Sequence, residues 1–170
     1  MFVNMRSNDA YFGLPHDVFA FTMLQELVAR SVGVDVGDYK HSVGSLHLYE
    51  DNFVGARSYL AEAWQSKISM PAMPASDPWV AIGKVRTVEE LLRTQGRADL
   101  AGSGLDDYWK DLCRLLVAYR LFRDRDVEGM RNIRAQLSGD TFKVFIDAKL
   151  DALVDGCQSI AVTNTDGAKP

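Results

Sequence analysis

Hydrophobic positions in the first hundred residues follow two different spacings along the chain. Residues 2–6 read as the end of a strand, and residues 39–49 alternate well enough to predict a second strand. Between them, apolar residues at helical spacing predict a helix over 17–31, and a further helix is expected over 52–66. This mixture of periods indicates an α+β fold for this part of the chain.

The pattern changes after residue 104 and becomes helical throughout. A proline-rich stretch at 70–78 reads as a linker or surface loop. Thr87 is a suitable N-cap, with Glu90 placed for a capping box, and predicts a helix beginning there. Three apolar stripes over 105–155 predict a helical appendage that packs as a small bundle or lies on a sheet. Residues 156–170 lack periodicity and are expected to form a flexible tail.

Composition narrows the possible partners. The 170 residues carry a net charge of -4, which gives no electrostatic case for binding nucleic acid or an anionic membrane. No apolar run approaches the roughly 20 residues of a membrane span, and no basic region precedes a hydrophobic stretch at the N-terminus. These features favour a cytoplasmic protein. Two cysteines and three histidines, without ligand-like spacing, predict neither a disulfide framework nor a metal site.

Polar residues suited to nucleotide recognition gather in two short segments, 6–17 and 44–49. Arg6 beside Ser7 suits a phosphate monoester, since guanidinium offers paired donors and the hydroxyl adds another. His47 and Tyr49 are two residues apart on the predicted strand, so they project side by side and can share a sugar hydroxyl. With the carboxylates between them, these residues can contact the phosphate, base and sugar of one nucleotide.

The order and spacing of these residues resemble the thymidylate synthase family, which includes the pyrimidine-nucleotide hydroxymethylases. The family pattern is Arg-Ser-x-Asp, then Gly-x-Pro, an Asn or Asp at a helix start, and Gly-Asp-x-His-x-Tyr, and the likeness covers Phe2 to about Asn52. It implies an α+β fold with a thymidylate-synthase-type sheet-and-helix core in residues 1–100, to which this chain adds a C-terminal helical subdomain. It also implies a homodimer or a complementing subunit, a pyrimidine nucleoside monophosphate as substrate, and 5,10-methylenetetrahydrofolate as the one-carbon donor to C5.

The resemblance also implies a role for each matching residue. It assigns the 5′-phosphate to Arg6 and Ser7, the pterin of the folate to Asp9, and the 3′-hydroxyl to His47 and Tyr49. Asp17 then faces the edge of the pyrimidine. Ser45 stands where the family has an acidic residue, and His16 replaces a common phenylalanine.

Asp17 is the most informative departure from the synthases that act on deoxyuridylate, which carry asparagine there. An amide can donate to uracil O4 and accept from N3–H, whereas an ionised carboxylate can only accept. Cytosine offers an N4 donor to a carboxylate, and a protonated Asp17 can donate to cytosine N3. The chain is therefore expected to prefer a cytidine nucleotide.

The catalytic thiolate is missing from the place where the family has it. That cysteine lies upstream of the Arg-Ser-x-Asp strand, and the five residues before Arg6 include no cysteine. Cys113 and Cys157 lie on or beside apolar helical stripes and are expected to be buried small hydrophobes. We assign no catalytic residue to this chain.

Each site residue also has a structural interpretation when it is taken alone. Asp17 could cap a helix, Arg6 could be a surface ion-pair partner, and Asp9 could hold its own backbone in a turn. His47 and Tyr49 could be half-buried strand residues. These separate interpretations do not explain why all five types occur in the family's order and spacing.

Three functional hypotheses follow from the sequence. The chain is the C-terminal part of a longer pyrimidine C5 methyl- or hydroxymethyltransferase, truncated by a misplaced start codon. Alternatively, it is a non-catalytic nucleotide-binding subunit, or one that complements a chain carrying the cysteine. In the third hypothesis, the helices over 105–153 form a protein-interaction module and the nucleotide pocket is a relic.

Overall fold

The computed structural model describes residues 1–62 and 68–165, with side chains described up to residue 154. The fold is mixed α+β and mostly helical, with two small parallel sheets, which confirms the fold class in its broad form. Two compact units are present, one of residues 1–68 with 73–79 and the other of residues 69–72 with 80–170. No helix in the described part of the chain is long and apolar enough to cross a membrane.

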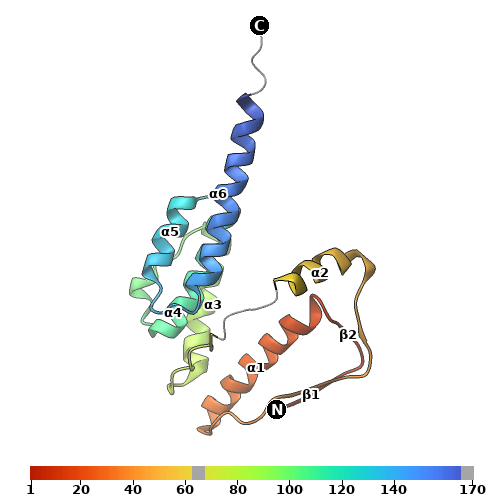
Figure 1. Cartoon of the computed structure of the whole chain (residues 1–170). Helices are drawn as coiled ribbons and strands as arrows, with labels where there is room; N and C mark the ends of the chain where they lie inside the picture. Colours follow the sequence, from red (N-terminus) through yellow and green to blue (C-terminus); the bar gives the residue numbers. More distant parts are fainter. Residues whose placement is uncertain (63–67, 166–170) are drawn as a thin grey trace. The chain divides into compact units, whose positions relative to one another are not determined.

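The first unit contains two pairs of parallel strands and two helices (Figure 1). The order along the chain is β1 (Phe2–Met5), β2 (Asn8–Asp9), α1 (Gly13–Val32), β3 (Lys40–Val43), β4 (Leu46–His47), a 3-10 turn (Glu50–Asn52) and α2 (Phe53–Ala61). β1 pairs with β3 and β2 pairs with β4. Parallel strands need a crossover connection, and α1 supplies it for both pairs.

The predicted strand over 39–49 is interrupted at Gly44 and Ser45, so it appears as β3 and β4. At this break the two strand pairs approach closely. A Cβ atom built on Gly44 would lie 3.0 Å from the backbone oxygen of Arg6, and the Gly44 N–H donates to Met5 O at 2.9 Å. A glycine is therefore needed for β3 and β4 to follow the bend between β1 and β2.

Helix α1 begins at Gly13, four residues before the predicted start at Asp17, so that prediction was wrong. The Asp9 carboxylate accepts hydrogen bonds from the backbone N–H groups of Tyr11 and Phe12, which turns the chain into the helix early. Pro15 then lies in the first turn, where its missing N–H costs nothing. The helix ends at Gly33, whose φ of 70° belongs to the left-handed region.

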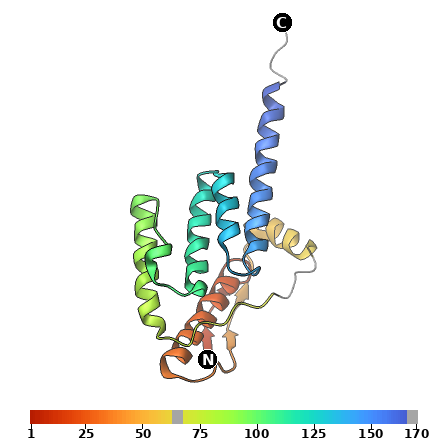
Figure 2. The same ribbon diagram turned by 90° about the vertical axis from the view of Figure 1, so that its left-hand side faces the viewer.

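The second unit is helical, and its last three helices share one hydrophobic core (Figure 2). Its helices are α3 (Pro78–Gln95), whose first two residues are grouped with the first unit, α4 (Asp107–Arg123), α5 (Val127–Gln136) and α6 (Lys143–Thr165), with a 3-10 turn (Ala101–Ser103) between α3 and α4. The buried core residues of α4, α5, α6 and the α5–α6 connection are Ala118, Met130, Ile133, Leu137, Ile146, Leu150 and Leu153. Three of the predicted apolar stripes thus meet as a small bundle.

Helix α3 begins nine residues before the predicted N-cap at Thr87, so that prediction was also wrong. Asp77 accepts a hydrogen bond from the Trp79 backbone N–H at 2.9 Å, and Pro78 occupies the first helical position. Thr87 lies inside the helix, and its hydroxyl donates to Gly83 O at 3.2 Å. The boundary between the two units therefore falls at residues 79 and 80 rather than near residue 100. At the other end, α6 extends to Thr165, into the expected tail, and 166–170 lie outside the described residues.

Candidate functional site

Ser7, His47 and Tyr49 come together beside the β2–β4 pair. Asp9 and His47 are partners in the parallel register, and the Ala10 N–H donates to His47 O at 2.8 Å. The Ser7 hydroxyl lies 3.4 Å from Nδ1 of His47, and the His47 and Tyr49 rings meet edge to face with centroids 4.8 Å apart. Ser7 and Tyr49 are exposed and His47 is half-buried, so all three polar groups are accessible to a ligand.

Asp9 is held by the loop that it organises. Its two carboxylate oxygens accept from Tyr11 N at 3.0 Å and from Phe12 N at 3.2 Å. The hydrogen bond from Tyr11 is the main cause that lowers the pKa of Asp9 below its ordinary value, and the charge of His47 adds a small part. Asp9 is therefore an ionised acceptor at neutral pH, and each oxygen keeps a further lone pair for a ligand.

Asp17 lies in the second turn of α1 and is half-buried. Among the described residues it makes no hydrogen bond and no ion pair. Tyr39 lies within its electrostatic reach, since burial first and the charge of Asp17 second raise the pKa of Tyr39. The Tyr39 hydroxyl in turn lies 2.7 Å from Nδ1 of His41. No hydrogen bond joins this group to Ser7 or to His47 in the described part of the chain.

Arg6 stands at the turn between β1 and β2, next to Gly44, and its side chain is exposed. No ion pair engages its guanidinium within the described residues. The structural interpretation of Arg6 as a surface ion-pair partner is therefore not what the structure shows. Its fork of N–H donors is available beside Ser7 for an oxyanion.

No described cysteine is suited to act as a nucleophile. Cys113 lies on α4 with 0% of its surface exposed, and burial raises its pKa to about 11. A thiol with that pKa is protonated at neutral pH and is not reactive. This confirms the prediction that Cys113 is a buried small hydrophobe, whereas the side chain of Cys157 lies outside the described residues.

Some residues that shape the site were missed by sequence reasoning. Asn8 is buried, and its Oδ1 would lie 2.2 Å from a Cβ atom built on Gly13, so only glycine fits there. Similarly, a Cβ atom on Gly55 of α2 would lie 2.4 Å from the Tyr11 hydroxyl. These close approaches fix the loop between β2 and α1 and, with it, the position of Asp9. Glycines three or more residues from any predicted turn were the available signal.

Comparison with known proteins bears on the same region of the chain. A family model described as Thymidylate synthase matches residues 1–79. The thymidylate synthases of Listeria monocytogenes serovar 1/2a and Listeria innocua are each 32% identical over 72 residues, and that of Listeria monocytogenes serotype 4a is 31% identical. These matches cover 42% of this chain and 22% of each relative, so the chain spans about a fifth of their length.

The matched region coincides with the first structural unit. The family match ends at residue 79, where the contacts divide the chain, and it contains every candidate residue described above. Residues 1–79 of this chain belong to the thymidylate synthase family.

Proposed function

We propose that the first unit binds a pyrimidine nucleoside monophosphate through Arg6, Ser7, His47 and Tyr49. The observation that carries this proposal is the grouping of the Ser7 hydroxyl, the His47 imidazole and the Tyr49 ring beside a free arginine. Arg6 and Ser7 would receive the 5′-phosphate, and His47 with Tyr49 would receive the 3′-hydroxyl of the sugar. The family match supports this assignment, and it supports a thymidylate-synthase-type core for the unit.

Asp17 supports a preference for cytosine over uracil. A half-buried carboxylate without a hydrogen-bond partner among the described residues has acceptor capacity left for a ligand. The N4 amino group of cytosine can donate to it, whereas uracil presents an acceptor, O4, at the same position. A polar mismatch of this kind discriminates by up to about four orders of magnitude when it leaves a buried group unpaired.

The described residues fit a folate only in part. Asp9 is ionised and can accept an N–H from a pterin, which agrees with the role that the family resemblance implies. In the family, 5,10-methylenetetrahydrofolate supplies the one-carbon group once a thiolate has added to C6 of the pyrimidine. Because Cys113 is buried and protonated, we propose nucleotide binding by this chain and no chemical step.

Calorimetric titration of the full chain with deoxycytidylate and deoxyuridylate tests this proposal. Deoxycytidylate should bind more tightly, and Asp17→Asn should shift the preference towards deoxyuridylate. Arg6→Ala should weaken both by about ten-fold or more, because a charge-assisted hydrogen bond to the phosphate is lost. Arg57→Ala, at an exposed position on α2, is the matched control and should leave affinity unchanged. Absence of binding, or equal effects of the two arginine substitutions, would support the relic-pocket hypothesis instead.

A second candidate function is that of a complementing subunit. The first unit exposes large apolar side chains to an unusual degree, including Phe2 at 74%, Val54 at 82% and Leu60 at 74%. Exposed apolar surface of this extent is typical of a protein–protein contact. Sedimentation across a range of concentrations tests this role, since a self-association that Val54→Lys abolishes would favour it. A strictly monomeric chain at all concentrations would exclude the homodimer.

A further inference from the structure

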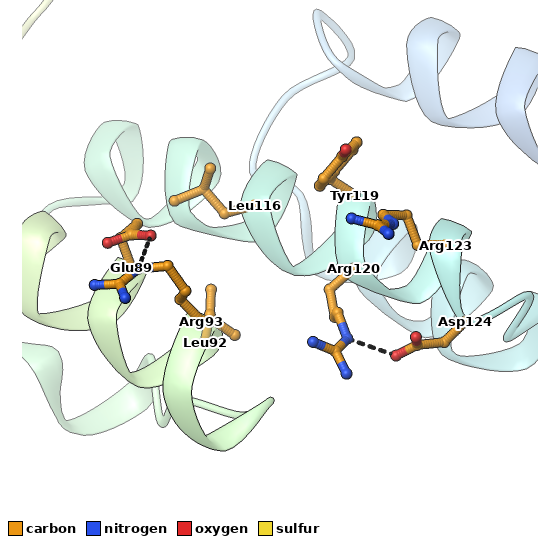
Figure 3. A pocket seen from close by; sticks show the side chains of 8 residues that line it. All are labelled: Glu89, Leu92, Arg93, Leu116, Tyr119, Arg120, Arg123 and Asp124. Atoms are coloured by element: carbon orange, nitrogen blue, oxygen red, sulfur yellow. Dashed lines mark hydrogen bonds and ion pairs between the residues drawn. The ribbon is translucent and has the colours of Figure 1, made fainter.

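The second unit contains a groove between α3 and α4 that is unrelated to the nucleotide residues (Figure 3). Its volume is about 510 Å³, which lies within the range of pockets for small molecules, roughly 300–1,000 Å³. Leu92 of α3 and Leu116 of α4 form its apolar wall. Tyr119, Arg120 and Arg123 of α4 line the other part.

The arginines of this groove are held in a particular way. Nε of Arg120 donates to Asp124 at 2.7 Å, and Nε of Arg93 donates to Glu89 at 3.1 Å, each within one helix. This leaves the two terminal nitrogens of each guanidinium without a carboxylate partner in the described part of the chain. A guanidinium recognises a phosphate or carboxylate best through such a pair of parallel donors.

Arg123 adds a third cation one helical turn from Arg120, on the same face of α4. No described residue forms an ion pair with Arg123. Nη2 of Arg120 also lies 4.0 Å from the position of a Cβ atom built on Gly96, so this side chain reaches the end of α3 on the far wall. The groove therefore carries an excess of positive charge in a chain whose net charge is -4.

Apolar exposure in the groove is not explained by packing within the unit. Leu116 is 39% exposed and Tyr119 is 64% exposed, although both belong to the apolar stripe of α4, and Leu92 at 7% forms a buried base between them. Ion pairs on an exposed helix face contribute little to stability, so stability alone does not account for this arrangement. Apolar surface beside unpaired guanidinium donors suits a ligand with both characters.

We propose that this groove binds a small anionic ligand that carries a phosphate or carboxylate group on an apolar or aromatic body. Arg120 and Arg123 hold the oxyanion, and the Tyr119 ring, Leu92 and Leu116 cover the apolar body. The site is separate from the nucleotide site of the first unit and from its proposed function.

The test is a titration of the ¹⁵N-labelled full chain with phenyl phosphate and, separately, with phenylacetate, followed by NMR. Saturable shifts of amides in α3 and α4 are expected, and comparison of the two probes shows which anion is preferred. Inorganic phosphate, which lacks the apolar body, should bind more weakly by about ten-fold or more. Shifts near Arg6 and Ser7 report the nucleotide site and are scored separately, so failure of one proposal does not affect the other.

The variants Arg120→Gln and Arg123→Gln should each weaken binding by about ten-fold, since each removes charge-assisted donors. Arg131→Gln removes an exposed arginine of α5 that is paired with Glu128 at 3.8 Å outside the groove, and it should change nothing. Thermal melting of each variant confirms that the exposed substitutions leave the fold intact. No saturable shift in α3 and α4 with either probe would overturn the proposal. So would equal losses in the groove variants and in Arg131→Gln.

Discussion

The substitution Asp111→Ala should destabilise the helical unit strongly. Asp111 lies on α4 and is 6% exposed, and its carboxylate joins two parts of the unit. It accepts from Nη1 of Arg114 at 2.6 Å, and from the backbone N–H of Ser138, just after α5, at 3.2 Å. The Ser138 hydroxyl adds a third donor at 3.4 Å. Removal of this carboxylate leaves the Arg114 charge and the Ser138 N–H without their acceptor.

The magnitude follows from the burial of the pair. The side chains of Asp111 and Arg114 are 8% and 14% exposed, so little water can replace the lost carboxylate. Breaking a buried ion pair by removing one partner costs about 3–5 kcal/mol. We expect a loss of about 3 kcal/mol in the free energy of unfolding, because Arg114 keeps some contact with water. The double substitution Asp111→Ala with Arg114→Leu should cost less than the sum of the two single changes, since it leaves no unpaired charge.

Urea denaturation measures these free energies, with circular dichroism for the helices and the fluorescence of Trp109 for the core. Trp109 lies on α4 and is 2% exposed, so it reports the unfolding of this unit. Lys110→Ala, the neighbouring position, serves as the control for a change of charge without loss of the network. A cost below about 1 kcal/mol for Asp111→Ala, or strict additivity in the double variant, would refute the reasoning.

Further predictions concern the core, an ion pair and a glycine. Ile146→Ala, at a position with 0% exposure, should cost about 2–5 kcal/mol in denaturant unfolding, and a smaller loss would mean that the core collapses around the cavity. The hydrogen bond from Arg134 lowers the pKa of Asp147 below 3.8, so its stabilisation is present above that pH and is lost as the pH falls through the lowered value. Acid titration of Asp147→Asn should therefore show the stability difference from the parent disappear below about pH 4, and a difference that persists would contradict the ion pair. Gly13→Ala should force Asn8 aside and increase amide hydrogen exchange at the start of α1, whereas unchanged protection would show that Asn8 moves without cost.

The helices of the second unit could be predicted from the sequence, but their buried faces could be predicted only in part. The apolar stripe of α4 indicated a helix correctly, yet Trp109, Cys113 and Ala118 are the buried hydrophobic positions of that helix. Leu116 and Tyr119 of the same stripe are exposed, because the neighbouring helices leave the groove open beside them. Hydrophobic spacing identifies a helix and its apolar side, whereas the position of each neighbour decides which residues are covered.

The start of α3 was missed because two N-cap signals compete in the sequence. Asp77 followed by Pro78 is a strong start signal, with an acceptor side chain before a proline in the first turn. The signal lay within a proline-rich stretch that reads as a linker, and Thr87 offered a plausible cap further along. Tertiary contacts decided between them, since Ala81 and Val88 on α3 are both buried.

The candidate site shows a similar division between motif and context. Spacing alone placed Ser7, His47 and Tyr49 in one set, and the parallel register of β2 and β4 brings them together. Asp9 also occupies its expected place, but its hydrogen bonds to Tyr11 and Phe12 depend on backbone geometry that spacing does not reveal. A residue can therefore keep the family's position and also perform the structural role that it has when considered alone.

The two units differ in what stabilises them, and this affects how nucleotide binding should be measured. The second unit has a buried core across three helices, whereas the first exposes residues such as Phe2 and Val54 and relies on short strand pairs. Two-stranded sheets are marginally stable in water unless other elements cover them. If only a fraction of the chains holds the first unit in its binding-competent form, every measured affinity falls by that same fraction. The ratio of deoxycytidylate to deoxyuridylate affinity is independent of this fraction, so it is the quantity that isolates the contribution of Asp17.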